Sequence, residues 1–359
     1  MSGGVDSSTT ASILKKQGYA VFGLTLNLYS CDRPLKRGCC TPMDRLDARK
    51  ICEKLEIPFE TQDCRSEFKT KIIDYFAAEY RRGRTPLPCA PCNSEIRFQA
   101  LLDYADKIGA YWIATGHYAR VEHQSERSFL LKGKDPKKDQ SYFLFSLKPE
   151  LLKRLLLPLG ELAKSEVRAI AKELGLAVHD KKDSQELCFL SGIHHDEFIR
   201  ENYPEYFMPS GNFVNEKGKV LGRHRGLPAY TLGQRRGLEV SLGKRQYVVK
   251  LDTQKNEVIL GDKSLLRAKG LVAANIGWTD STYAKTLEGK NIEVKIRSTH
   301  PGVSSVMAWN CHSVSVDFKE PQFSVVPGQA VVFYEGERLL GGGWIEEAIC
   351  DEQRREETT

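Results

Sequence analysis

Apolar positions recur at helical spacing along the first half of the chain, and short apolar or alternating stretches separate them. This pattern predicts helices at residues 9–17, 42–55, 67–80 and 93–107, and strands at residues 19–28 and 111–115. Gly18, Gly83 and Gly109 follow three of these helices, where glycine suits the C′ position. Alternating strands and helices predict an α/β domain with a parallel sheet, whose ligands bind at the carboxyl ends of the strands.

The pattern changes after about residue 191. Helices predicted at residues 151–157 and 165–174 complete the first domain, and a short helix follows at residues 196–202. Short strands are then predicted at residues 211–214 and 219–221, a hairpin at 246–260, and longer strands at 271–278, 291–297, 303–309, 312–318 and 329–334. Regularly spaced strands of this kind predict a small β-barrel. We therefore expect a first domain at 1–191, a small central domain at 192–266, a C-terminal β-barrel at 267–350 and a disordered tail at 351–359.

Composition narrows the class of protein. The 359 residues are 41% hydrophobic and 28% charged, as in ordinary globular proteins, and no apolar run reaches the length of a membrane span. Because no signal peptide is visible either, we expect a cytoplasmic protein with no membrane partner. The net charge is +6, and positive residues cluster at 81–84, 132–138 and 223–236. Each cluster alone is typical of a solvated surface, but three of them favour a polyanionic partner such as RNA.

The string Ser-Gly-Gly-Val-Asp-Ser-Ser at residues 2–8 is the first candidate site. Glycines let the backbone approach phosphate oxygens, and a loop that opens a helix presents backbone N–H groups to an anion. The string lacks the Gly-Lys-Ser/Thr of a Walker loop and resembles the pyrophosphate loop of enzymes that adenylate a substrate. Asp6 is expected to hold Mg²⁺ or to orient the turn. Because such a loop follows a buried strand and this chain starts at Met1, we expect the true N-terminus to lie upstream.

Cysteines supply the second candidate chemistry. Ten cysteines in a cytosolic chain are not expected to form structural disulfides. Cys52, Cys64, Cys311 and Cys350 have the contexts of packing residues, and Cys31, Cys39 and Cys40 share a basic loop that could bind a metal. Cys89 and Cys92 precede a predicted helix, whose dipole favours a thiolate. A Cys-x-x-Cys pair also suits half of a zinc site or a redox pair, but no second pair with zinc spacing follows.

The chain resembles the tRNA-specific 2-thiouridylase family of the PP-loop ATP pyrophosphatase superfamily. The matching segments run in order along nearly the whole chain: 2–8, 84–86, 92–93 with 95–96 and 98, 114–118, 138–144, 183–189, 230–237, 327–334 and 341–343. The resemblance implies that Cys92 is the nucleophile and that Cys188 carries a persulfide. It implies ATP contacts at Ser2, Gly3, Gly4, Val5, Asp6, Ser7, Ser8, Leu26 and Gly116. It implies contacts with the target base at Leu87, Pro88 and Cys89, and contacts with tRNA at His117, Lys138, Asp139, Gln140, Arg297, Ser298 and Gln329.

The implied reaction is the ATP-dependent 2-thiolation of the wobble uridine of tRNA. ATP with Mg²⁺ adenylates the C2 oxygen, and sulfur then replaces it, either released from the Cys188 persulfide by Cys92 or by direct attack of the persulfide. The implied partners are the anticodon arm of tRNA and a sulfur-donor protein such as a cysteine desulfurase, and we expect a monomer.

One departure from the family leaves an alternative open. Many members carry aspartate where this chain has Cys89, and three thiolates at Cys89, Cys92 and Cys188 can hold an iron–sulfur cluster that carries sulfide. Two rival functions are another PP-loop ligase and a tRNA-binding protein with a decayed nucleotide site. A ligase of that kind needs no reactive cysteine pair and no barrel.

Overall fold

The computed structural model describes residues 1–29, 42–125, 127–181, 187–190, 192–238, 240, 245–310 and 313–350. The chain divides into two compact units. The first contains Met1–Ile72, Cys89–Gly192 and Gly336–Leu340, and the second contains Ile73–Pro88, Ile193–Glu335 and the residues from Gly341 on. The loop with Cys31, Cys39 and Cys40, Cys311 and the predicted tail at 351–359 lie outside the described residues. The three-domain division at residues 191 and 266 stays a prediction.

The first unit is built from helices and short parallel strand pairs. Its helices are α1 (Val5–Lys16), α2 (Pro42–Lys54), α3 (Arg65–Phe68), α5 (Cys89–Pro91), α6 (Phe98–Lys107), α7 (Pro149–Leu152) and α8 (Lys164–Glu173). π-Helical segments follow α3 at Lys69–Ile73 and α5 at Cys92–Arg97. Gly18 and Gly109 follow α1 and α6 with φ of +87° and +70°, which confirms the predicted helix ends.

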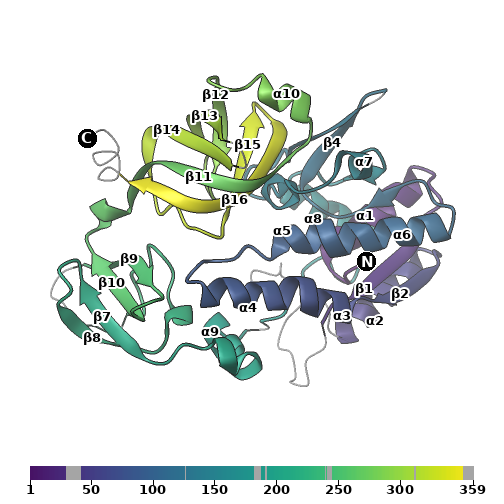
Figure 1. The fold of residues 1–359 in the computed structure, drawn as a ribbon. Coiled ribbons are helices and arrows are strands. Elements are labelled where there is room, and N and C mark those ends of the chain that lie inside the picture. The colour runs from purple at the N-terminus through teal and green to yellow at the C-terminus, as the bar shows by residue number, and fades with distance from the viewer. Residues whose placement is uncertain are drawn as a thin grey trace. The chain divides into compact units, whose positions relative to one another are not determined.

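The strands of the first unit form three pairs. They are β1 (Gly23–Asn27), β2 (Phe59–Asp63), β3 (Ile113–Ala114), β4 (Ala119–His123), β5 (Ser128–Lys132) and β6 (Leu155–Leu156). β1 pairs with β2 and β3 with β6, both in parallel, whereas β4 and β5 form an antiparallel hairpin. The parallel pairs and the surrounding helices confirm the predicted α/β class (Figure 1).

A shared apolar cluster holds α1 against α2 and α8. It contains Val5 of α1, Ile51 of α2 and Ala171 of α8, together with Leu176 and Val178 after α8. All five are buried, so the start of α1 is fixed by packing and not only by its own turn. The loop at residues 2–8 therefore sits on a rigid support.

The second unit starts with α4 (Asp74–Arg81) and α9 (His195–Asn202), which pack through the rings of Phe76 and Phe198. A four-stranded sheet follows in the order β8-β7-β10-β9, made of β7 (Gly211–Asn215), β8 (Val220–His224), β9 (Tyr247–Asp252) and β10 (Glu257–Gly261). β9 and β10 are antiparallel, which confirms the predicted hairpin at 246–260. Its core includes Phe213, Val248 and Val258.

The last six strands of the described chain close into a barrel (Figure 1) and belong to the second unit except for residues 338–340. They are β11 (Arg267–Trp278), β12 (Asn291–Lys295), β13 (Val303–Asn310), β14 (Ser313–Phe323), β15 (Ala330–Glu335) and β16 (Arg338–Cys350), and α10 (Ser281–Lys285) lies between β11 and β12. β11 pairs with both β14 and β16, so the six strands form a ring. Buried and more exposed residues alternate along β12 and along the start of β14, as expected for strands with one face on a core. The predicted barrel is confirmed.

Several elements differ from the sequence prediction. The helix predicted at 151–157 is wrong beyond Leu152, where α7 ends, and Leu155–Leu156 pairs with β3 as a strand. A short leucine run fits a buried helix or a buried strand, and tertiary pairing decides between them. The strand predicted at 19–28 is limited to Gly23–Asn27, and the helix predicted from residue 9 already begins at Val5. β2, β4, β5 and β16 were not predicted.

Candidate active site

The loop at residues 2–8 lies at the start of α1 in the first unit. Gly3 has a φ of +66°, and a Cβ added there would lie 2.1 Å from the carbonyl oxygen of Asp44, so only glycine fits. Gly4 is the N-cap, and residues from Val5 onward are helical. The second half of the string is therefore the first turn of α1, where backbone N–H groups lack intrahelical acceptors and suit an anion.

Serine hydroxyls tighten this loop. The Ser2 backbone N–H donates to Ser7 Oγ over 3.1 Å, and the two hydroxyls lie 3.1 Å apart. Ser7 and Ser8 each donate to the Gly4 carbonyl, over 3.2 and 2.7 Å. Ser8 is buried, whereas Ser2 and Ser7 remain half-buried. The loop is thus preorganised, and the hydroxyls of Ser2 and Ser7 are the accessible ones.

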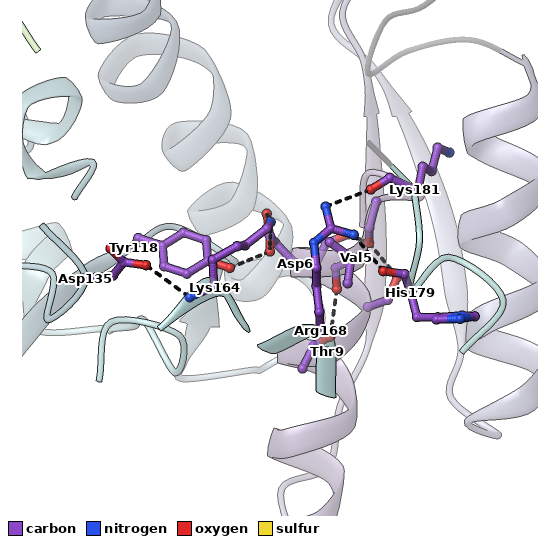
Figure 2. Close-up of polar contacts among 12 residues, drawn as sticks. Val5, Asp6, Thr9, Tyr118, Asp135, Lys164, Arg168, His179 and Lys181 are labelled. Carbon is purple, nitrogen blue, oxygen red and sulfur yellow. Dashed lines mark hydrogen bonds and ion pairs between the residues drawn. The ribbon is translucent and has the colours of Figure 1, made fainter. Parts of the chain in front are cut away.

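Asp6 is bound by two neighbours from distant parts of the chain (Figure 2). Lys164 Nζ lies 2.7 and 2.8 Å from its two carboxylate oxygens, and Tyr118 Oη donates to Oδ1 over 2.7 Å. The Lys164 side chain is only 11% exposed. An ammonium group this close disfavours a cation on the same carboxylate. The contacts therefore favour the expectation that Asp6 orients the turn over the expectation that it holds Mg²⁺.

Gly116 lies directly against the first turn of α1, as expected for the end of β3. A Cβ added at Gly116 would lie 2.8 Å from the carbonyl carbon of Asp6 and 3.0 Å from the backbone nitrogen of Ser7. The structure therefore brings Gly116 to the loop, whereas Leu26 is half-buried on β1. Their contacts with ATP stay a prediction.

His117 is held in a neutral state beside this turn. Its Nδ1 shares a 2.8 Å hydrogen bond with Thr115 Oγ1, and its ring stacks on Phe98 at a centroid distance of 5.7 Å. Burial, together with the positive charge of Arg97, lowers the pKa of His117 to about 4. A neutral imidazole can donate or accept a hydrogen bond but carries no charge toward RNA at neutral pH.

The predicted reactive cysteines also belong to the first unit. Cys92 is buried at the start of the π-helical segment Cys92–Arg97, whereas Cys89, which begins α5, and Cys188 are half-buried. The helix therefore starts at Cys89, three residues earlier than the Cys92 thiol. π-Helical segments are rare in proteins, and those that occur are often at functional sites, which agrees with a special role for this turn.

A fourth thiol lies in the same neighbourhood. Cys64 is buried before α3, and burial raises the pKa of its thiol to about 11, with smaller contributions from nearby negative groups that include Cys92. Phe68 of α3 packs edge-on against Phe189, the residue after Cys188, at a centroid distance of 6.0 Å. α3 thus contacts the segments that carry both predicted cysteines. The sequence assigned Cys64 to packing, and its buried position agrees with that.

The described part of the chain, which includes Cys89, Cys92 and Cys188, contains no group of three histidine, cysteine or acidic side chains that could hold a metal ion. The structure therefore offers no support for the three-cysteine cluster. In the same residues, no helix is both long enough and apolar enough to cross a bilayer.

Three predicted tRNA contacts of the first unit lie in one loop. Asp139 Oδ1 accepts hydrogen bonds from the backbone of Gly133 and Ser141, over 3.0 and 3.1 Å. Gln140 pairs with the backbone of Tyr118 in both directions, through its side-chain oxygen and its own N–H. Asp139 and Gln140 therefore shape the loop, and Lys138 precedes them on it.

The other predicted RNA-facing residues belong to the second unit. Gln329 Nε2 donates to the carbonyls of Thr85 and Pro86, over 3.0 and 3.2 Å, and Arg84 forms ion pairs with Glu79 and Glu346. These contacts hold the strap of residues 84–88, in which Leu87 and Pro88 are buried. Arg297 donates to the Phe323 carbonyl over 3.3 Å, and Ser298 is half-buried in a turn.

Sequence reasoning missed three basic residues beside the loop: Lys164, Arg168 and Lys181. Lys164 binds Asp6, and Lys181 donates to the Gly3 carbonyl. Arg168 donates to the carbonyls of His179 and Lys181. The loop residues that Lys164 and Lys181 contact lie more than 150 residues away in the sequence, so no local pattern marks these two lysines.

These features define an α/β unit with a glycine-containing loop at a helix start, whose geometry suits an anion, in a chain that continues into a small sheet and a six-stranded barrel. In comparison with known proteins, three family models match successive parts of the chain. A family model described as the tRNA methyl transferase HUP domain matches residues 1–192, one described as the tRNA methyl transferase PRC-barrel domain matches 196–262, and one described as the aminomethyltransferase beta-barrel domain matches 268–345.

Full-length relatives carry one common name. A protein from Clostridium tetani called tRNA-specific 2-thiouridylase MnmA 2 is 43% identical over 350 residues, which cover 96% of this chain and 97% of the relative. A Clostridium beijerinckii protein called tRNA-specific 2-thiouridylase MnmA is 42% identical over 353 residues, 97% of this chain and 98% of the relative. The chain belongs to the tRNA-specific 2-thiouridylase family, which confirms the resemblance found in the sequence.

Proposed function

We propose that this protein is an ATP-dependent sulfurtransferase that converts the C2 oxygen of the wobble uridine of tRNA to sulfur. One observation carries the proposal: the chain matches proteins named tRNA-specific 2-thiouridylases from end to end. The first unit supports it independently, because a preorganised anion loop and the two predicted cysteines belong to the same compact unit.

The first step in the proposal is adenylation. The C2 oxygen attacks the α-phosphorus of ATP, a bond forms between them, and pyrophosphate leaves. The loop at residues 2–8 binds the phosphates through backbone N–H groups and the hydroxyls of Ser2 and Ser7. Mg²⁺, when bound with ATP, offsets phosphate charge. Asp6 keeps the turn in place through Lys164 and Tyr118 and is not assigned as a ligand of that ion.

Sulfur transfer is the second step. Cys188 carries a persulfide, and the Cys92 thiolate attacks its inner sulfur. The Cys92–Cys188 disulfide forms and hydrosulfide leaves. Hydrosulfide then attacks C2, and AMP departs with the former C2 oxygen. A thiol reductant must reduce the disulfide before the next turnover.

Recognition of tRNA is assigned to both units. We propose that Lys138, Asp139, Gln140 and His117 of the first unit, and Arg297, Ser298 and Gln329 of the second, contact the anticodon arm. A base that reacts at C2 has to leave its stack, and residues 87–89 are proposed to receive it. A cysteine desulfurase or a relay protein supplies the sulfur that Cys188 carries.

The proposal is tested with purified protein, unmodified tRNA transcript, ATP and a cysteine desulfurase with cysteine. We expect AMP formation that depends on tRNA, and 2-thiouridine in the digested tRNA by mass spectrometry. Cys92→Ser and Cys188→Ser should abolish 2-thiouridine, whereas Cys350→Ser, which alters another half-buried cysteine, should not. No tRNA-dependent AMP from the wild type would refute the proposal, and normal thiolation by Cys92→Ser would refute the sulfur route.

A further inference from the structure

Lys181 makes three polar contacts at the back of the loop at residues 2–8. Its Nζ donates to the Gly3 carbonyl over 2.9 Å, to Asp44 Oδ1 over 2.7 Å and to Asp47 Oδ2 over 2.8 Å. A lysine ammonium has three N–H donors, so these acceptors use all of them. Lys181 therefore joins α2 to the loop by a single group.

The negative charges of Asp44 and Asp47 oppose anion binding at the loop, and the positive charge of Lys181 compensates them. Asp44 is buried, and its backbone lies so close to Gly3 that a Cβ there would meet it at 2.1 Å. Lys181 Nζ contacts both carboxylates and the Gly3 carbonyl, so the two carboxylates lie near the loop and would repel phosphate unless a cation compensates them. Burial lowers the pKa of Lys181, but its hydrogen bonds with Asp44 and Asp47 outweigh this and raise the pKa, so the compensating charge is stable.

The position of Lys181 is itself fixed from a third element. Arg168 of α8 donates to the carbonyls of His179 and Lys181, over 2.7 and 3.0 Å (Figure 2). Leu176 and Val178 before it belong to the apolar cluster under α1. The ammonium group is therefore presented to Gly3 by a well-anchored backbone, in contrast to an ordinary surface lysine.

We infer that Lys181 is a positioning residue of the phosphate loop, which neutralises Asp44 and Asp47 and holds the Gly3 carbonyl so that the loop accepts the phosphates of ATP. The inference rests on the proposed function only for the identity of the ligand. It assigns Lys181 no part in sulfur transfer, so ATP binding alone tests it.

The test measures ATP and adenosine binding by calorimetry, without tRNA or sulfur donor. Lys181→Gln should weaken ATP binding about tenfold or more, which corresponds to about 1.4 kcal/mol, and should leave adenosine binding nearly unchanged. Lys54→Gln is the matched control. Lys54 also bridges α2 to the region after α8, through the carbonyls of Leu174 and Gly175, but contacts neither the loop nor these carboxylates. It should leave ATP affinity unchanged.

A double variant that also removes one carboxylate distinguishes loss of charge compensation from loss of structure. In Lys181→Gln/Asp47→Asn, one uncompensated carboxylate is gone, so ATP affinity should recover several-fold relative to Lys181→Gln. Asp47→Asn alone should fold and bind ATP at least as tightly as the wild type, which keeps the test open if Lys181→Gln does not fold. If the wild type binds no ATP, the proposed function fails. If the wild type binds ATP and Lys181→Gln binds it equally well, or if Asp47→Asn weakens binding, the inference alone fails.

Discussion

Alanine at Gly3 and alanine at Gly4 should separate the folding of the phosphate loop from its function. At Gly3 the φ of +66° costs a residue with a Cβ about 1–2 kcal/mol. The methyl group would also meet the Asp44 carbonyl oxygen at 2.1 Å, and backbone overpacking of this kind costs about 1–3 kcal/mol. We therefore expect Gly3→Ala to destabilise the first unit by about 2–5 kcal/mol.

Gly4 offers the contrasting case one residue later. Its φ is −102°, and the nearest atom to an added Cβ, Ser2 Oγ, lies at an ordinary 3.5 Å. The folded state therefore tolerates alanine at a cost below about 1 kcal/mol. If phosphate oxygens approach the backbone here, the same methyl group occupies their place. Gly4→Ala should bind ATP at least about tenfold more weakly while it folds normally.

Thermal unfolding and ATP calorimetry on the two variants measure both effects. A destabilisation of 1 kcal/mol lowers the unfolding midpoint by about 2–4 °C in a unit of this size, so Gly3→Ala should lose about 4–20 °C. Gly277→Ala is the control, because no atom lies within 4 Å of a Cβ added there and the position belongs to the barrel. A Gly3→Ala protein as stable as the wild type would refute the close-approach argument. Normal ATP affinity in Gly4→Ala would refute the placement of the phosphates.

Three further predictions address single contacts. Lys164→Met leaves the Asp6 carboxylate without its ion pair and should cost about 1–3 kcal/mol in urea unfolding, part of which Lys164→Met/Asp6→Asn recovers. Gln329→Glu replaces the amide that donates to two carbonyls of the strap by an acceptor, and should cost about 1–3 kcal/mol, whereas Gln329→Lys, which keeps a donor, should cost less. The pKa of His117 is about 4 in the folded protein and near 6.5 in the unfolded chain, so the unfolded state binds more protons between these pH values. The free energy of unfolding should therefore rise with pH from about 4 to 6.5. His117→Gln should flatten that rise in denaturant titrations. An unchanged pH profile in His117→Gln would show that other groups set it.

The helices of the first unit were predictable because their signals are local. The helices predicted to end at residues 17 and 107 combine apolar periodicity with a glycine stop, and α1 and α6 end at Lys16 and Lys107. Strands with weak local signals were missed. β2 is mostly polar and exposed, and β16 contains Gly341, Gly342 and Gly343, which interrupt the alternation typical of a strand.

The candidate site was predictable only in part for a related reason. The seven residues at 2–8 are enough to predict a phosphate loop. The close approach of Gly116 to this loop follows from the rule that ligands bind at the carboxyl ends of strands. Lys164 and Lys181 become part of the site only when α8 packs on α1. Nothing near them in sequence distinguishes them from other lysines of a basic chain.

The contacts of Asp139, Gln140 and Gln329 limit how these residues can contribute to RNA binding. Asp139 accepts two backbone N–H groups, and Gln140 fixes the backbone of Tyr118, whose hydroxyl group in turn binds Asp6. A carboxylate or amide whose hydrogen bonds are already made gains little free energy from a contact with phosphate. If the side chain turned away to make that contact, the hydrogen bonds that hold the loop would be lost. In the proposed complex with tRNA, we therefore expect these residues to act chiefly by fixing the backbone that RNA meets. Gln140 then links the loop that we assign to tRNA, through Tyr118, to the turn that we assign to ATP.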